Sequence, residues 1–327
     1  VQYQWLKTLS SSFSDVTAVG DDDQSIYGWR GAKVENILSF ERDFKETKVV
    51  KLEQNYRSTS NILNAANAVI KRNADRLGKN LWTDLGEGEP IFLYSAFNEN
   101  DEARYIVENL KSWIDQGNNR QDAAVLYRSN AQSRVIESAL LQFDIPYRVY
   151  GGQRFFERLE IKNALAYMRL ILNCHDDVAF ERVVNIPPRG IGERTVDAVR
   201  EHARNISISM WSAAKAMIVD KNLNTRSANA LAAFLNLINE MTNTLEALPL
   251  SELAENSIEM SGLIEMHRRE KGERGQSRVE NLEELVGACK NFTPESIDTP
   301  VLAQFLDQVS LEAGERQANE DQDAVQL

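Results

Sequence analysis

Residues 16–32, VTAVGDDDQSIYGWRGA, give the first indication of a fold. Residues 16–20, Val-Thr-Ala-Val-Gly, predict a short buried strand, and the acidic residues 21–23 predict a loop directly after it. In a parallel sheet such a loop lies at the carboxyl edge, where α/β folds bind their ligands. Aromatic side chains beside an arginine suit base stacking, worth about 1–3 kcal/mol per base. An acidic loop followed by a core tryptophan is an equally good interpretation of the same composition. The loop's candidate binding side chains are Gln24, Tyr27, Trp29 and Arg30.

The sequence on either side of this stretch alternates between predicted strands and helices. Further strands are predicted at 49–53, 91–97, 123–128 and 147–150, and helices at 1–9, from Ser60 onward, at 101–116 and at 131–143. Ser58, Thr59 or Ser60 can cap the helix that begins there. Such alternation is typical of a mostly parallel sheet covered by helices, which predicts an α/β fold.

The pattern changes after Gly151 and Gly152 and is almost wholly helical over residues 160–305. One apolar stripe at helical spacing comprises Val279, Leu282, Leu285, Val286 and Cys289. We therefore predict an all-α region from 151 to 323. Residues 323–327 predict a strand without a partner, and the helix at 1–9 has no preceding cap. Both observations lead us to expect a fragment of a longer protein.

Composition narrows the protein class. The chain has 327 residues, a net charge of −12 and 43% apolar residues, values that suit a soluble globular protein of two or three domains. No apolar run approaches the length of a membrane span. Cys174 and Cys289 lack metal-site spacing, which favours a reducing, cytoplasmic compartment over a disulfide framework. Residues 151–239 carry a net charge of +3, so the acidic mean does not exclude local DNA-binding patches.

Two more stretches carry candidate chemistry. Residues 54–59, QNYRST, follow a predicted strand, and an arginine there could reach a γ-phosphate. Residues 187–195, PPRGIGERT, place two glycines around one apolar residue, which lets a tight turn approach a phosphate backbone. Thr195 and the first N–H groups of the next helix can then bind a phosphate. Taken alone, each stretch is better explained as a capped helix start or a simple turn.

Six stretches, taken together and in order, resemble superfamily 1A DNA helicases of the UvrD/Rep/PcrA family. They cover nearly the whole chain, so a chance match is excluded. The stretches are VGDDDQSIYGWRGA (19–32), QNYRST (54–59), LYRSNAQSR (126–134), IPYRVYGGQRFFER (145–158), PPRGIGERT (187–195) and KGERGQSRVENLEELV (271–286).

The resemblance implies an ATP-dependent helicase that translocates 3′ to 5′ on single-stranded DNA, separates duplex DNA and acts in DNA repair. It implies partial RecA-like parallel-sheet domains plus an all-α 2B domain. Residues 1–53 would be the end of domain 1A and 54–150 the first half of 2A. Residues 151–323 would be 2B, and 324–327 would begin the strand that returns to 2A. Implied partners are single-stranded DNA, duplex DNA and DNA-repair proteins, near the nucleoid and with no membrane.

The resemblance also assigns roles to individual residues. Gln24 would contact the γ-phosphate, Tyr56 the adenine, and Arg57 would act as an arginine finger, a part that contributes about 10³–10⁵ in rate. The single strand would be bound by Tyr27, Trp29, Arg30, Arg128 and Asn130. Duplex DNA would be bound by Arg189, Gly190, Ile191, Gly192, Arg194 and Thr195.

Two expected parts of an ATPase are absent from the sequence. No GxxxxGK followed by Ser or Thr occurs, and no apolar strand ends in Asp-Glu, so the ligands of Mg²⁺ are expected outside these residues. We expect no ATPase activity from this chain alone. The three aspartates 21–23 are better explained by helix capping and solvation than by a metal site. Two alternatives stay open at this stage: an ATPase-inactive module that docks duplex DNA or a partner, and the motor of a helicase–nuclease.

Overall fold

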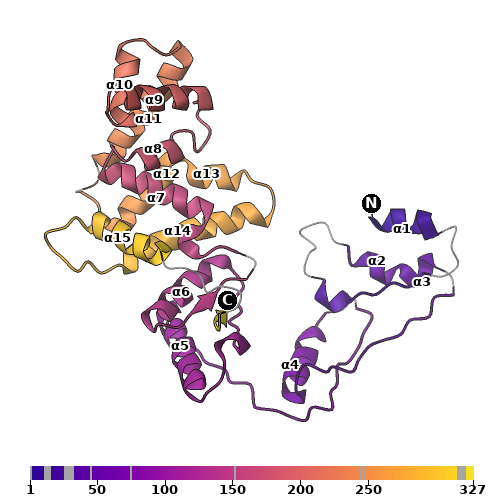
Figure 1. Cartoon of the computed structure of the whole chain (residues 1–327). Helices are drawn as coiled ribbons and strands as arrows, with labels where there is room; N and C mark the ends of the chain where they lie inside the picture. The colour runs from indigo at the N-terminus through magenta and orange to yellow at the C-terminus, as the bar shows by residue number, and fades with distance from the viewer. Residues whose placement is uncertain are drawn as a thin grey trace. The chain divides into compact units, whose positions relative to one another are not determined.

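The computed structural model describes residues 2–10, 16–25, 33–44, 46–73, 76–150, 152–243, 245, 247–314 and 322–327. The chain forms two compact units, Val1–Ser95 and Ala96–Leu327, which Figure 1 colours from indigo to yellow along the sequence. Each unit is described by itself. The predicted domain boundaries near residues 53, 150 and 323 stay a prediction.

The first unit contains four helices in its described part. They are α1 Gln2–Ser10, α2 Glu35–Leu38, α3 Phe40–Asp43 and α4 Ser60–Ile70, with one 3-10 turn, η1 Asp22–Gln24. The predicted helices at the N-terminus and from Ser60 are therefore confirmed. Leu63 on α4 is the one buried apolar side chain among the described residues of this unit.

The strands predicted at 16–20, 49–53 and 91–97 are wrong: these segments belong to no sheet. Their apolar side chains are exposed, Val19 by 90%, Leu52 by 77% and Leu93 by 94%. A strand is stabilised by hydrogen bonds to a neighbouring strand. Among the described residues of these three segments and their surroundings, an isolated parallel bridge between Gln54 and Trp82 is the single sheet-like pairing.

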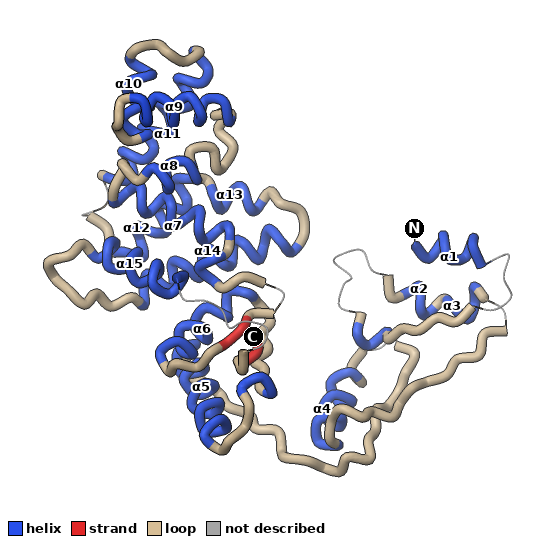
Figure 2. The backbone as a smooth tube through the Cα atoms, in the orientation of Figure 1, coloured by secondary structure: helices blue, strands red, loops and turns tan. Residues whose placement is uncertain are grey.

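The second unit begins with helices packed against a small parallel sheet. Its elements are α5 Glu99–Asp115, α6 Ser133–Gln142, β1 Tyr147–Arg148 and β2 Val325–Gln326, the strands shown red in Figure 2. β1 and β2 pair in parallel with Tyr147 opposite Val325. Val107, Leu140 and Val325 lie in the core that these elements enclose. The predicted helices at 101–116 and 131–143 and the strand at 147–150 are confirmed within a few residues.

The end of the chain lies between two segments from far upstream. The Val125 amide donates to the Gln326 carbonyl at 2.8 Å, and the Gln326 amide donates to the Ala123 carbonyl at 3.0 Å. The strand predicted at the C-terminus is thus real, but the expectation that it has no partner is wrong. The strand predicted at 123–128 reduces to one bridge, Ala124 to Gln326, and Leu126 is 89% exposed.

The rest of the second unit is helical, as predicted. Its helices are α7 Leu159–Leu172, α8 Asp177–Val183, α9 Glu193–Asn205, α10 Met210–Val219, α11 Thr225–Thr242, α12 Leu250–Ser261, α13 Leu263–Arg268, α14 Glu273–Asn291 and α15 Val301–Gly314. Short polar side chains begin several of them; Asp176, Ser209 and Asn224 each accept a hydrogen bond from an amide of the first turn.

Helix α7 lies at the centre of this helical body. It is apolar on nearly all sides, and Tyr167, Met168 and Leu170 are fully buried, which is the pattern of a helix surrounded by others. Four residues of the predicted stripe on α14, Leu282, Leu285, Val286 and Cys289, pack in the same core. Both cysteines are free. None of the described helices has the length and apolarity needed to cross a membrane. A mostly helical chain with a small parallel sheet agrees with the predicted α/β class.

Candidate functional site

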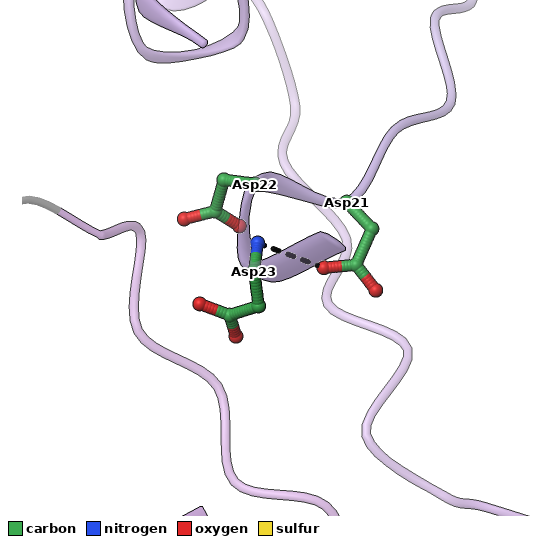
Figure 3. Close-up of side chains that lie close together, drawn as sticks. All are labelled: Asp21, Asp22 and Asp23. Carbon is green, nitrogen blue, oxygen red and sulfur yellow. Dashed lines mark hydrogen bonds between the residues drawn. The ribbon is translucent and has the colours of Figure 1, made fainter. Parts of the chain in front are cut away.

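The acidic turn at residues 21–23 is held by its own backbone and by two cations. Asp21 caps η1 by accepting from the Asp23 amide at 3.1 Å, which is the dashed line in Figure 3. The three carboxylates approach one another within 4.8 Å. Arg76 forms a two-pronged pair with Asp23 at 2.8 and 2.5 Å, and Lys79 lies 2.5 Å from Asp21. Capping is therefore confirmed for Asp21, whereas Asp22 accepts from the Leu77 amide and Asp23 pairs with Arg76.

Gln24 lies at the end of this turn and is exposed. Its side-chain amide donates to Asp21 Oδ2 at 2.6 Å. Partial burial raises the pKa of Asp21, but the hydrogen bonds from Lys79 and Gln24 outweigh it, so the net shift is downward. Asp21 therefore stays ionised and orients the Gln24 side chain. Tyr27, Trp29 and Arg30 lie outside the described residues.

Residues 76–82 connect the acidic turn to the QNYRST segment. The Leu77 amide donates to Asp22 Oδ2 at 2.7 Å, and Lys51 Nζ donates to the Leu77 carbonyl at 2.9 Å. Further along, the Trp82 amide donates to the Glu53 carbonyl at 3.0 Å. The structure thus links the loops of Gln24 and Arg57 through one intervening piece of chain.

The QNYRST segment presents Tyr56 and Arg57 on a side-chain-stabilised turn. Asn55 Oδ1 accepts from the Arg57 and Ser58 amides at 2.9 and 2.8 Å, an Asx turn. Tyr56 is 78% exposed and donates to Gln54 Oε1 at 2.9 Å. Arg57 is exposed, and its guanidinium has no polar partner among the described residues. It is therefore available to a ligand.

The N-terminus of α4 is not capped by a hydroxyl side chain, contrary to the prediction. Thr59 occupies the N-cap position, but its side chain makes no capping hydrogen bond. Instead the Ser60 and Asn61 amides donate to the Gly86 and Glu87 carbonyls at 2.8 and 3.1 Å. The helix start is thus satisfied by backbone from a neighbouring segment, which sequence spacing does not reveal.

The loop with Arg128 and Asn130 is closed by Gln132. Gln132 Oε1 accepts from the Arg128 and Ser129 amides at 3.0 and 2.9 Å. The Arg128 side chain is exposed and has no polar partner in the described part of the chain. Asn130 is exposed as well, with its amide 3.4 Å from Ser277 Oγ on α14. Both side chains remain accessible to a strand of DNA.

The turn at 190–192 is held on its inner side by Asn185 and is open to solvent at Gly192. Asn185 Oδ1 accepts from the Arg189 and Ile191 amides at 2.8 and 3.2 Å, and Ile191 is buried. Gly190 has φ of +80°, a conformation that favours glycine. Gly192 has ordinary φ, and a Cβ there would meet nothing within 4 Å. Nothing inside the described structure thus requires glycine at 192.

The side chains beside this turn divide into two groups. Arg194, the second residue of α9, is exposed with no polar partner among the described residues. Thr195 is half-buried, and its hydroxyl lies 3.2 Å from Ser227 Oγ. Arg200 is engaged by Glu181 and Asp197. Arg194 is therefore the arginine of the 187–195 stretch whose side chain is free in the described structure.

Arg189 points inward, contrary to its predicted place on the DNA-facing side. Its guanidinium donates to the Pro187 carbonyl at 3.1 Å and to the Ser261 carbonyl at 2.8 Å. It also lies over the rings of Tyr167 and Phe234, 5.7 and 5.6 Å from their centres. Arg189 thus ties the turn to the end of α12.

Comparison with known proteins is decisive at this point. A model of the UvrD-like helicase C-terminal domain matches residues 50–327, and a model of the UvrD/REP helicase N-terminal domain matches residues 1–45. This chain belongs to the UvrD-like helicase family. DNA helicase II of Escherichia coli K12 is 55% identical over the whole chain, which covers 46% of that relative. PcrA, an ATP-dependent DNA helicase of Staphylococcus epidermidis, is 42% identical over 95% of the chain and 43% of its own length. The chain thus spans about half the length of these relatives.

Sequence reasoning missed one feature of this UvrD-like helicase chain, a buried polar network. Glu137 and Arg158 are buried, as is Asn281. Glu137 accepts from Ser133 Oγ at 2.6 Å, from Tyr147 OH at 3.2 Å and from the Phe155 amide at 3.3 Å. Burial is the main cause of the raised pKa of Glu137. A signal was present, because Glu137 shares a helical face with the apolar Leu140 and Leu141.

Proposed function

We propose that this chain is part of an ATP-dependent DNA helicase that translocates 3′ to 5′ on single-stranded DNA and unwinds duplex DNA. The cofactors would be ATP and Mg²⁺, and the setting DNA repair, with repair proteins as partners. Because the chain has no GxxxxGK motif, these 327 residues alone would bind DNA but not hydrolyse ATP.

The observation that carries the proposal is that certain arginines of the motifs have exposed guanidinium groups without polar partners. Arg57, Arg128 and Arg194 are exposed without polar partners in the described structure, as is Arg274 in the last motif. Arg134 and Arg189, in the same motifs as Arg128 and Arg194, are engaged internally. Free arginines occur elsewhere on the surface, so motif position and availability together support the assignment. A free guanidinium on a fixed backbone is suited to phosphate.

For ATP, we assign the γ-phosphate to Gln24 and Arg57 and the adenine to Tyr56. The Asp21 bond that orients Gln24 and the Asx turn that exposes Arg57 both favour this assignment. Neutralising charge on the transferring phosphoryl group is worth about 10³–10⁵ in rate in related chemistry. The site would lie between two RecA-like domains.

The assignment of the first unit to a RecA-like sheet rests on the likeness of its motifs to the helicase family, because residues 16–20, 49–53 and 91–97 form no strand in the structure. We assign residues 1–53 to domain 1A, 54–150 together with 324–327 to 2A, and 151–323 to 2B. The pairing of Val325 with Tyr147 favours the return of the chain to 2A.

For DNA, we assign the single strand to Tyr27, Trp29, Arg30, Arg128 and Asn130. Duplex would approach the turn at Gly190 and Gly192, where the open side of Gly192 leaves room for a phosphate backbone. Arg194, Thr195 and the first amides of α9 would bind the phosphate. Ile191 and Arg189 would support the turn from inside.

The test is binding of the 327-residue chain to blunt duplex, single strand and a 3′-tailed junction across a salt series. We expect preference for duplex or junction, weakened by salt as phosphate contacts require. A Gly192→Glu variant should lose that preference, because a carboxylate would occupy the open side of the turn. Equal binding of all three DNAs by both proteins would remove the duplex assignment.

The absence of hydrolysis is a separate prediction. The purified chain, saturated with single-stranded DNA, should show no magnesium-dependent ATP turnover above a no-protein blank, because the phosphates have no Gly-rich loop or lysine to hold them. A coupled phosphate-release assay measures this. Turnover that an Arg57→Ala variant abolishes would show that the missing motif is dispensable.

A further inference from the structure

The loop that carries Arg128 and Asn130 is attached to α14 by polar side chains. Ser129 Oγ donates to Glu280 Oε2 at 2.7 Å, and Arg134 Nε donates to Glu284 Oε1 at 2.5 Å. Together with Ser277, these glutamates recur every three to four residues and so lie along one face of α14. We call Ser277, Glu280, Asn281 and Glu284 the polar face of α14.

Arg158 lies where this face, the loop and α6 meet. Its Nη1 donates to the Asn130 carbonyl at 2.7 Å and to Asn281 Oδ1 at 3.0 Å. Its Nη2 donates to Ser133 Oγ at 2.8 Å. One guanidinium thus holds the loop backbone, the first turn of α6 and α14 at once. A lysine has no planar fork and cannot make these bonds together.

The other side of α14 is built into the helical body. Leu282, Leu285 and Cys289 are buried in the core around α7. The connection is also polar, because Asn281 Nδ2 donates to Glu160 Oε1 on α7 at 2.6 Å. Packed helices move as rigid pieces. The loop therefore moves with the helical body as long as its hydrogen bonds to the polar face of α14 are made.

We propose that Arg158 and the polar face of α14 position the loop at 128–134, so that the helical body sets how Arg128 and Asn130 meet single-stranded DNA. Arg158 is a positioning residue, since it reaches the DNA only through the loop. This inference rests on the single-strand contact of the proposed function. It adds that a structural change in the helical body alters the contact with single-stranded DNA through α14.

The first variant removes the attachment from the α14 side. Glu280→Ala combined with Glu284→Ala deletes both acceptors while keeping a strong helix former at each position. Glu283→Ala is the matched control, because it is the same substitution on an exposed position of the same helix. Arg158→Lys is the second variant and removes the central fork while keeping the charge.

The first readout is amide hydrogen exchange of residues 128–134 in the free chain. We expect exchange to be roughly tenfold faster in the double variant and in Arg158→Lys, with α7 and α11 unchanged, because only the loop loses its attachment. Glu283→Ala should match the wild type. If the loop exchanges at the wild-type rate in both variants, the proposed attachment is wrong, whatever the DNA result.

The second readout is affinity for an oligothymidylate of about 20 nucleotides, a length that exceeds a typical single-strand site. Removing two carboxylates by itself favours DNA binding, as Glu283→Ala should show on a smaller scale. We nevertheless expect roughly tenfold weaker binding by the double variant. A faster-exchanging loop with undiminished affinity would overturn the positioning role. A wild-type chain that does not bind the oligonucleotide would refute the proposed strand contact, while the exchange rates still decide whether α14 holds the loop.

Discussion

At the scale of single residues, the turn at 190–192 separates two reasons for a glycine. Gly190 needs its positive φ, so Gly190→Ala should destabilise the chain by about 1–2 kcal/mol. Gly192 is the N-cap of α9 and has open space where a Cβ would be. The backbone requires glycine at 190, whereas no contact in the described structure requires it at 192.

Gly192→Ser should therefore move stability and duplex binding in opposite directions. Serine is a slightly better N-cap than glycine, so the free energy of unfolding should rise by a few tenths of a kcal/mol and the Tm with it. Duplex affinity should fall about tenfold, because the side chain separates the turn from the phosphates. Calorimetry and fluorescence anisotropy measure the two quantities. Unchanged duplex affinity in a stabilised variant would make Gly192 a simple cap.

The two arginines beside this turn should respond differently to salt. Arg194→Gln should leave stability unchanged and reduce the slope of log affinity against log salt by about 0.9, the value for one lost phosphate contact. Arg189→Gln should leave the slope unchanged and lower stability by about 1–3 kcal/mol, because buried carbonyls lose their donor. Duplex titrations at several salt concentrations, beside urea unfolding, distinguish them. A reduced slope for Arg189→Gln would return that residue to the DNA surface.

At the scale of elements, the contact between α6 and β1 contains the buried acid Glu137. Its titratable neighbours are the charged Arg158 and the neutral Tyr147 and Tyr127. Burial raises its folded-state pKa above 4.5, so the stability it contributes is present below that value and lost as pH rises through the folded pKa.

Glu137→Gln should remove this dependence. Between pH 7.5 and pH 5, the wild type should gain unfolding free energy relative to the variant, because only the wild type takes up a proton on Glu137. Urea unfolding at each pH measures the difference. Glu108→Gln, on the exposed side of α5, is the control and should run parallel to the wild type. A constant difference between wild type and Glu137→Gln would show that this carboxyl does not titrate in the range.

At the scale of the whole molecule, the two compact units differ in how much core they contain. The second unit encloses two apolar clusters, one around α7 and one around β1 and β2. Among the described residues of the first unit, Leu63 alone is a buried apolar side chain. A stable domain must bury a large share of its apolar surface.

A chain of residues 96–327 should therefore unfold cooperatively by itself, within a few degrees of the main transition of the whole chain. A chain of residues 1–95 should show no cooperative transition, since it has little buried area to lose. Differential scanning calorimetry of the three chains measures this. If the chain of residues 96–327 melts without a heat-absorption peak, the first unit is needed to stabilise the core of the second unit.

The sequence by itself determined the longer helices, the family and the place of the motifs, but not the short helices α2 and α3. Helix signals are local, so α1, α4, α5, α6 and the helical body followed from caps and from spacing within a few residues. Strands were predicted less well, because a strand exists only beside a partner. The parallel partner of Tyr147 is Val325, at the far end of the sequence.

Only the tertiary structure decided which side chains of a motif are available. Arg189 and Arg194 stand five residues apart in one motif, but the first binds the carbonyl of Ser261, 72 positions further on. Likewise, Arg158 is central because folding brings Asn130, Ser133 and Asn281 around it. The residue types of a motif indicate which chemistry is possible. Whether a charge faces solvent or is already engaged depends on contacts between distant segments, which form only when the apolar core is packed.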